Sequence, residues 1–314
     1  MSDGDGDRMT RKRPRDPPFV EDYRPYTGRQ LARVLEGRAT HKHHWDLYYR
    51  NNTVNGYRDR HYIIREFHEL REALDGLKQA VAAPLHDVVW MEAGCGVGNA
   101  LLPILEDYDD TVGWRIVGFD ISSVAIALLQ EKRAALPAQQ QRKLSVQVLD
   151  PVEEDIPIAG ASSVCRRPLA KEPVDFVSMI FVLCSIPVEH HLLVLRRVAA
   201  CMKEGGIFFF RDYCVTDHAE RRFSSNRLVE ENTFARTNGT LSHFFTATEV
   251  RRLFEAAELD VVELSVVERE VLNRKEGVNL QRRFLQGRFR KAKRRGEDKD
   301  DVVADASAMI RVNT

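Results

Sequence analysis

Acidic residues follow three successive apolar segments of this sequence, and a glycine-rich turn follows the first segment. The residues after segments 88–91, 115–119 and 144–149 include Glu92, Gly94, Gly96, Gly98, Asp120 and Asp150. In an open parallel sheet, ligands bind beyond the carboxyl ends of the strands, and the first turn needs glycine so that a ligand can approach the backbone. These residues therefore predict one small-molecule site along the edge of a sheet.

The spacing of the glycines separates two classes of ligand. A dinucleotide-binding turn reads GxGxxG, but Asn99 stands at the position of the third glycine, which weakens a pyrophosphate interpretation. A zwitterion fits better, because Glu92 can accept a hydrogen bond from an ammonium group, directly or through water, while the turn amides face a carboxylate. Asp120 is placed to accept from ribose hydroxyls and Asp150 from an adenine amino group. We therefore predict S-adenosylmethionine as the cofactor.

Each of these features also has a purely structural interpretation. A lone glycine-rich turn is often only a tight turn, and a lone aspartate after a strand usually caps a helix. Three strand ends in succession that each carry an acidic residue favour a shared binding site over three separate structural roles.

Strand and helix patterns alternate along the middle of the chain. A fourth strand is expected from about Val174 to Leu183, a helix from Glu189 to Met202 and a fifth strand over Ile207–Phe210. This alternation implies βαβ units with a parallel sheet. Two late strands, Val261–Val271 and Arg282–Phe289, have too short a connection for a helical crossover and should pair antiparallel. The predicted fold is α/β, a mostly parallel sheet with a C-terminal antiparallel hairpin and helices on both faces.

Two helices carry start signals. Ser122 or Ser123 can cap the helix that follows the second strand. Thr246, with Glu249 three residues later, predicts a capping box, in which a hydroxyl and a carboxylate satisfy unpaired amide groups at the helix start.

The pattern divides the chain into four regions. Residues 1–25 are polar and proline-rich, which predicts disorder because such a composition buries too little apolar surface to offset chain entropy. Residues 26–80 show helical periodicity and form a predicted N-terminal extension. Residues 81–292 form the predicted sheet domain, with a polar insert at 212–245, and residues 293–314 form a predicted flexible tail.

Charge is balanced overall, with 47 Lys+Arg and 47 Asp+Glu among 314 residues, so net charge says nothing about nucleic acid. Basic residues nevertheless cluster at both ends of the chain, where they could reach phosphates or, at the N-terminus, act as a nuclear-import signal. The clusters are Arg8, Arg11, Lys12, Arg13 and Arg15, and then Arg282, Arg283, Arg288, Arg290, Lys291, Lys293, Arg294 and Arg295.

The five cysteines lie apart without a CxxC pair, which argues against a disulfide framework or a cysteine-based zinc site. His41, His43 and His44 have no carboxylate or cysteine partner at helical spacing, so we predict no metal. The N-terminal residues lack the apolar segment of a secretory signal, and the most apolar stretch, 176–188, is too short to span a membrane. We expect a cytoplasmic location, with the nucleus as a second compartment, and no membrane role.

Recognisable sequence blocks follow one another from about Thr40 to Arg290. They are HWDLYY at 44–49, YRDRHY at 57–62, REF at 65–67, MEAGCGVGN at 91–99, IFVL at 180–183, FRDY at 210–213, NGT at 238–240, FFT at 244–246, RKEG at 274–277 and FLQ at 284–286. In these blocks the chain resembles the tRNA 3-methylcytidine methyltransferases, a family of class I S-adenosylmethionine enzymes with a Rossmann-like sheet. Ordered blocks over this length are far more specific than the glycine turn alone.

The resemblance implies roles for residues that pattern alone leaves as core aromatics. It implies that Trp45 and Tyr49 close over the cofactor, where an aromatic face beside a sulfonium gains roughly 0.5–2 kcal/mol of cation–π attraction. The other implied cofactor-site residues are Gly94, Asp120, Asp150, Pro151 and Ile180. The chain departs from the family at Tyr62, where tryptophan is usual, at Pro151, where leucine is usual, and in a longer loop over 156–173.

The implied reaction is methylation of cytosine N3, a neutral nucleophile that needs alignment more than acid–base help. Because the product base is cationic, a carboxylate near the developing charge would favour the transition state over the ground state. Asp212 is the candidate for this catalytic role, and Arg211 is the candidate to hold a phosphate or a carboxylate. A structural salt bridge is the alternative for both residues.

The implied target is a cytidine in the anticodon loop of tRNA, favouring serine tRNA because the chain resembles the short family members. Some of those members depend on seryl-tRNA synthetase, which is therefore an implied partner. RNA recognition favours splayed bases stacked on aromatic rings, together with phosphate contacts from arginine. The helical extension over residues 26–80 is expected to act as a lid and to bind RNA. The candidate RNA-binding residues are Arg58, Arg60, Tyr62, Arg282, Arg283 and Arg288.

Two rival functions stay open at this point. In a small-molecule methyltransferase, the N-terminal extension would serve only as a lid over a closed pocket. In a non-catalytic subunit with the same fold, the protein would bind RNA or support another protein without methyl transfer. The intact acidic and glycine positions argue against lost cofactor binding, although not against lost chemistry.

Overall fold

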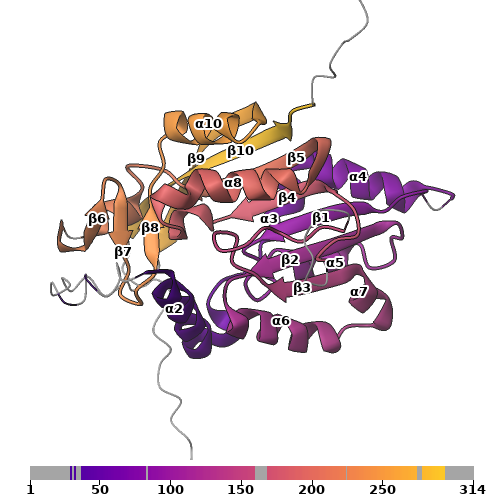
Figure 1. The fold of residues 1–314 in the computed structure, drawn as a ribbon, viewed down its shortest axis with the longest axis horizontal. Helices are drawn as coiled ribbons and strands as arrows, with labels where there is room; N and C mark the ends of the chain where they lie inside the picture. Colours follow the sequence, from indigo (N-terminus) through magenta and orange to yellow (C-terminus); the bar gives the residue numbers. More distant parts are fainter. Residues whose placement is uncertain are drawn as a thin grey trace, which may run out of the picture.

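A seven-stranded sheet with the order β3-β2-β1-β4-β5-β10-β9 forms the centre of the fold (Figure 1). Its strands are β1 (Val88–Ala93), β2 (Trp114–Asp120), β3 (Leu144–Val148), β4 (Val174–Ile180), β5 (Met202–Tyr213), β9 (Leu259–Asn273) and β10 (Val278–Lys291). Strands β1 to β5 pair in parallel, and β10 pairs antiparallel with both β5 and β9. The predicted fold class, including the C-terminal antiparallel pair, is confirmed.

The computed structural model describes residues 37–82, 84–159, 168–223, 225–273 and 278–293, together with Arg29 and Ala32. The predicted disorder of residues 1–25, the predicted tail from residue 294 onward and the turn around Gly277 lie outside the described residues.

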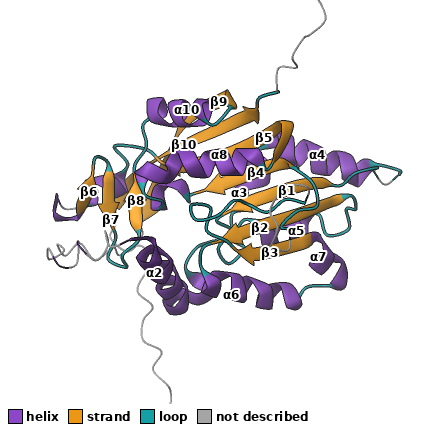
Figure 2. Ribbon diagram, viewed as in Figure 1, coloured by secondary structure: helices purple, strands orange, loops and turns teal. Residues whose placement is uncertain are grey.

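Helices lie on both faces of the sheet (Figure 2). Two apolar clusters bury the sheet between them, as expected for parallel strands that are buried on both sides. One cluster receives side chains from α8 and α10, and the other receives them from α4, α5 and α6. The bounds of these helices are α4 His68–Gln79, α5 Leu101–Asp107, α6 Ser123–Ala134, α8 His191–Ala200 and α10 Ala247–Ala256. The short helices η2 (Leu183–Ser185) and α7 (Ala138–Lys143) were not predicted from the sequence pattern, and η3 (Val188–His190) lies at the start of the helix predicted from Glu189.

Strand ends differ from the sequence expectation where the backbone turns. The fourth strand ends at Ile180 instead of Leu183, because Phe181 has a φ of 58°, which is a left-handed and not an extended conformation. The expected helix over Glu189–Met202 ends at Ala200, and Met202 instead begins the fifth strand.

Both predicted helix caps are present. Ser122 Oγ accepts a hydrogen bond from the amide of Ala125 at 3.1 Å, at the start of α6. Thr246 Oγ1 accepts from the amide of Glu249 at 3.1 Å, and the Glu249 carboxylate accepts from the Thr246 amide, which completes the capping box of α10. These local signals were readable because each involves residues within one helical turn.

The N-terminal extension contains α2 (Gly37–Asn52), η1 (Thr53–Asn55), α3 (Tyr62–Glu66) and α4. Phe67, between α3 and α4, stacks on Phe209 of β5 with ring centroids 4.6 Å apart, and Leu70 and Leu74 are fully buried against the sheet. By contrast, α2 packs beside α6 at the end of the sheet where β1 and β2 terminate. The predicted domain boundary near residue 80 stays a prediction.

The polar insert folds as a separate small sheet next to α2 (Figure 1). Its elements are α9 (His218–Arg222), η4 (Ser225–Arg227), β6 (Leu228–Glu230), β7 (Thr233–Ala235) and β8 (Leu241–His243). The His44 ring of α2 lies against Gly239, where any Cβ would come within 2.5 Å of the ring atoms. Gly239 therefore allows α2 and the insert to touch. Within the described part of the chain, no helix is long and apolar enough to cross a membrane.

Replacing Thr246 with alanine should lower the free energy of unfolding by about 1 kcal/mol, because the first turn of α10 loses its cap. Chemical denaturation followed by circular dichroism measures the change. Thr237→Ala, at an exposed position outside any helix, serves as the matched control and should stay within about 0.5 kcal/mol of the parent protein. Equal stabilities of the two variants would contradict a stabilising capping box.

Candidate active site

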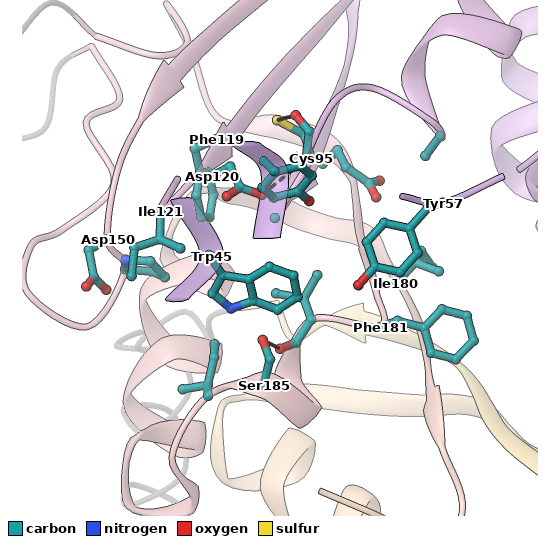
Figure 3. Close-up of a pocket in the computed structure, with 18 of the residues that line it drawn as sticks. Trp45, Tyr57, Cys95, Phe119, Asp120, Ile121, Asp150, Ile180, Phe181 and Ser185 are labelled. Atoms are coloured by element: carbon teal, nitrogen blue, oxygen red, sulfur yellow. Dashed lines mark hydrogen bonds between the residues drawn. The ribbon is translucent and has the colours of Figure 1, made fainter. Parts of the chain in front are cut away.

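A cavity lies at the carboxyl ends of β1, β2 and β4, next to α2 (Figure 3). Asp120, Ile121 and Asp150 lie at one end of it, Tyr57 and Phe181 lie at the other, and Trp45 lies between them. All nine residues predicted for the cofactor site line this cavity: Trp45, Tyr49, Glu92, Gly94, Gly96, Asp120, Asp150, Pro151 and Ile180. The structure thus brings them together, whereas their individual roles stay predictions.

The glycine-rich turn after β1 is glycine-specific for steric reasons. Gly94 and Gly96 have φ values of 70° and 53°, a region that disfavours side chains. A Cβ on Gly94 would come within 2.7 Å of Val182, and a Cβ on Gly96 would lie 2.6 Å from the Tyr49 hydroxyl. The absence of side chains therefore lets the turn pack directly against Tyr49 of α2 and against Val182, which follows β4.

The carboxylate of Asp120 connects three segments. Its Oδ2 accepts the amide hydrogen of Gly96 at 2.8 Å, and its Oδ1 accepts that of Ser122 at 2.9 Å. Burial raises the pKa of Asp120 to about 6, although the two amides act in the opposite direction. We had expected the turn amides to face the cofactor carboxylate, but the Gly96 amide is directed at Asp120 instead.

Glu92 is fully enclosed by the cavity wall and forms a buried hydrogen-bond chain. The indole Nε1 of Trp90 donates to Ser178 Oγ at 2.7 Å, and the Ser178 hydroxyl donates to Glu92 Oε2. Burial raises the pKa of Glu92 to about 8, and the charge of Arg60 lowers it. A raised pKa from burial in a cleft is typical of functional sites. Without a bound cation, Glu92 is therefore mostly a neutral carboxyl at pH 7.

Helix α2, the predicted lid, packs on α6 through Asp46, a side chain that the sequence analysis does not single out. Asp46 Oδ1 accepts from Ser122 Oγ at 2.6 Å and from the Val124 amide at 3.2 Å, at the start of α6. Trp45 and Tyr49 lie one helical turn apart on α2, and both rings line the cavity, with their centroids 6.0 Å apart. The lid is thus fixed to the same segment that Asp120 contacts.

The turn after β3 forms the edge of the cavity at Asp150 and Pro151. Asp150 Oδ1 accepts from the Val152 amide at 3.0 Å. Arg197 of α8 donates to the carbonyls of Pro151 at 3.1 Å and Val152 at 2.7 Å, which holds this turn in place.

The opposite end of the cavity contains residues that the cofactor prediction did not include. Arg60 donates to the Ile180 carbonyl at 2.7 Å, and its own amide donates to the Asn99 carbonyl at 2.8 Å. Phe181 and Tyr57 bring aromatic rings to the same end. The blocks at 57–62 and 180–183 contained these residues, but only the fold shows that the two blocks meet. Among the described residues, no group of three or more His, Cys, Asp or Glu side chains is arranged to hold a metal ion.

Residues 58–264 match a family model described as a methyltransferase domain. The chain is 35% identical over 247 residues to the tRNA N(3)-cytidine methyltransferase METTL6 of Rattus norvegicus, covering 79% of this chain and 78% of the relative. It is 32% identical over 253 residues to the tRNA N(3)-methylcytidine methyltransferase trm141 of Schizosaccharomyces pombe, covering 80% and 92%. This chain belongs to the tRNA N(3)-cytidine methyltransferase family.

A solved structure of a SAM-dependent methyltransferase from Methanosarcina mazei resembles this methyltransferase with a TM-score of 0.50 at 19% identity, covering 75% of this chain and 100% of that chain. At this identity the likeness supports the fold alone. The methyl donor of a class I methyltransferase domain is S-adenosylmethionine, and the cavity fits it. Glu92, Asp120 and Asp150 lie where they could accept from its ammonium, ribose and adenine groups. The glycine turn, which has no side chains, leaves space for the amino-acid part of the cofactor.

The predicted catalytic pair of the methyltransferase lies behind the cavity wall, because neither Asp212 nor Arg211 is among its lining residues. Asp212 is fully buried and accepts the amide hydrogens of Cys184 at 3.0 Å and Tyr213 at 2.8 Å. Burial raises the pKa of Asp212 to about 6. Its contacts support a positioning role, since Cys184 precedes Ser185 in the wall. A catalytic role for Asp212 stays a prediction.

Arg211 forms the structural arrangement that the sequence had left open as an alternative. Its Nη1 donates to Gln286 Oε1 at 3.1 Å and lies 3.7 Å from Glu66 Oε2. The guanidinium also lies over the rings of Tyr62 at 4.7 Å and Phe284 at 5.2 Å. Tyr62 therefore supports Arg211 and is absent from the cavity lining.

The three arginines predicted on the C-terminal strand all have carboxylate partners. Arg282 pairs with buried Asp217 at 3.1 Å and Arg283 pairs with Glu268 at 3.1 Å. Arg288 pairs with Glu69 of α4 at 2.5 Å. Their predicted RNA contacts stay predictions. Of the other candidates, Arg58 is exposed, whereas Arg60 lines the cavity.

Cofactor binding should release a proton at about pH 7.5. Glu92, with a pKa of about 8, starts mostly neutral, and an ammonium beside it favours the carboxylate, so affinity should rise with pH between about 7 and 8. Isothermal titration calorimetry in two buffers of different ionisation enthalpy measures the released proton.

Glu92→Gln should abolish the buffer dependence of the binding enthalpy and weaken binding about tenfold, because a charged hydrogen bond is lost. Glu106→Gln, at an exposed position of α5, is the matched control and should leave both quantities unchanged. Identical enthalpies for the parent protein in the two buffers would contradict this role of Glu92.

Proposed function

We propose that this protein transfers the methyl group of S-adenosylmethionine to N3 of a cytidine in tRNA. The observation that carries the proposal is one cavity that combines an acid-lined glycine turn with an aromatic end, in a chain whose relatives over four-fifths of its length are named for this reaction. The acid-lined end suits the cofactor, and the aromatic end suits a planar base.

The chain's own residues supply alignment. Asp120 fixes the glycine turn, Glu92 accepts a hydrogen bond from the ammonium group of the cofactor, and Trp45 of α2 forms an apolar wall of the cavity. Holding two reactants in line is worth on the order of 7–11 kcal/mol of barrier. Because N3 of an unpaired cytosine is already a free nucleophile, no general base is required.

The finer assignment is a cytidine in the anticodon loop of serine tRNA, with seryl-tRNA synthetase as a partner. A base has to leave its stack to enter a cavity of this kind, and loop bases do so at the lowest cost. Exposed Arg58 directly follows the cavity-lining residue Tyr57. A basic side chain at this position supports an acceptor with phosphate groups over a neutral small molecule.

The purified protein with labelled S-adenosylmethionine should form 3-methylcytidine in unmodified serine tRNA, as detected by nucleoside mass spectrometry. Asp120→Asn should reduce cofactor affinity about tenfold or more, because the carboxylate loses its charge. Product only in the presence of seryl-tRNA synthetase would establish that partner. No product under either condition, with cofactor binding intact, would contradict the substrate and favour a small-molecule or a non-catalytic role.

Arg58→Glu should weaken tRNA binding about fivefold at physiological salt and reduce the salt dependence of affinity by about one phosphate contact. Arg251→Glu, on the half-exposed surface of α10, is the matched control and should change neither quantity. Filter binding at several salt concentrations measures both. An Arg58 variant with the parent salt slope would remove this residue from the RNA surface.

A further inference from the structure

Phe181 has a backbone conformation that phenylalanine rarely adopts. It follows directly after β4 with a φ of 58°, and among the cavity-lining residues of the described chain only it and glycines have a positive φ. Its amide donates to the Arg211 carbonyl at 2.8 Å, which holds the turn closed. Such a conformation costs of order 1–3 kcal/mol and persists where the surrounding structure enforces it, typically at functional sites.

The ring of Phe181 is braced at the end of the cavity that faces away from the acid-lined strand ends (Figure 3). The centroid of its ring lies 5.0 Å from that of Tyr213 and 5.3 Å from that of Phe284, which it meets edge to face. Both neighbours belong to strands of the central sheet, β5 and β10. The left-handed turn thus directs a rigidly supported aromatic ring to the end of the cavity opposite Asp120 and Asp150.

The reaction moves a positive charge from one end of this cavity toward the other. The lone pair of cytosine N3 forms a bond to the methyl carbon while the bond from sulfur to that carbon breaks, and sulfur keeps the electron pair. The sulfonium becomes a neutral thioether, and the neutral base becomes a cation. An aromatic face near the base therefore interacts more strongly with the transition state than with the ground state, because the base is neutral in the ground state and partly positive in the transition state.

We propose that Phe181 is the platform for the acceptor base and lowers the barrier by cation–π attraction to the charge that develops on it. This inference rests on the proposed function. It also predicts a selectivity: the platform favours ring nitrogens whose methylation gives a cation, over exocyclic amines or carbon atoms whose methylation gives a neutral product.

Arg60 is the competing charge at this end of the cavity. Its guanidinium lies over the Phe181 ring at 5.5 Å and would repel a cationic base. Two acceptors offset that repulsion, the Ile180 carbonyl at 2.7 Å and the buried Glu92 carboxyl, whose pKa Arg60 lowers. The guanidinium also shows that a cation is accommodated over this ring.

Tyr57 is the other ring at this end of the cavity. Its ring packs against Tyr48 of α2 with ring centroids 5.4 Å apart, so α2 supports it. Its backbone conformation is not left-handed. Phe181 is the ring that the sheet itself supports, and for this reason we assign the platform to it.

The test replaces Phe181 with mono-, di- and trifluorophenylalanine, which keep the ring shape but progressively weaken its negative face. At saturating cofactor and tRNA, the logarithm of the single-turnover methylation rate should fall steadily with fluorine number, to about one-tenth of the parent rate. Phe181→Tyr should retain most of the rate, and Phe181→Leu should lose about as much as the trifluoro variant. Cofactor affinity should not change in any of them.

Trifluorophenylalanine at Phe176 is the matched control, because this residue belongs to β4, the strand that precedes Phe181, but packs on Phe209 in the core. It should leave the methylation rate unchanged. A parent protein that methylates tRNA, combined with a flat fluorine series at position 181, would overturn the platform and leave the proposed function intact. A parent protein that methylates no tRNA would overturn both.

Discussion

The carboxylate of Asp120 accepts amide hydrogens from two segments that are separate in sequence, the glycine turn at Gly96 and the helix start at Ser122. The Ser122 hydroxyl in turn donates to Asp46 of the lid. One buried carboxylate therefore holds the turn after β1 against the end of β2 and the start of α6. Helix α2 is in turn held to the start of α6 by Asp46. A buried carboxylate with unsatisfied oxygens would cost several kcal/mol, so these amides also make its burial tolerable.

Burial then separates the acidic residues of the site by their ionisation. Among the described residues, Glu92 accepts from a serine hydroxyl and has a pKa of about 8, whereas Asp120 accepts from two amides and has a pKa of about 6. At neutral pH the first is mostly neutral and the second mostly charged. Before a ligand binds, the two carboxyl groups at neighbouring strand ends therefore repel each other little, and an ammonium beside Glu92 would then favour its carboxylate form.

The sequence predicted those features of the fold and site whose causes are local. The glycine turn and the two helix caps each depend on residues within a few positions, and all were recognisable, whereas the end of the fourth strand was predicted wrongly. The ion pairs of Arg282 and Arg288 join residues 65 and 219 positions apart, so the sequence alone suggested free arginines. The left-handed conformation of Phe181 was equally unpredictable from the sequence, because it depends on a backbone hydrogen bond to Arg211 on the neighbouring strand β5.

The pairs that join Arg288 to Glu69 and Arg269 to Glu66 connect the C-terminal hairpin to helices from the first quarter of the chain. During synthesis those glutamates leave the ribosome long before their partners are made. Helices α3 and α4 therefore gain these contacts only after β9 and β10 have been made. The residues that line the cavity all lie between His41 and Pro187, so the hairpin that is synthesised last supports the cavity from behind, where Phe284 packs against Phe181.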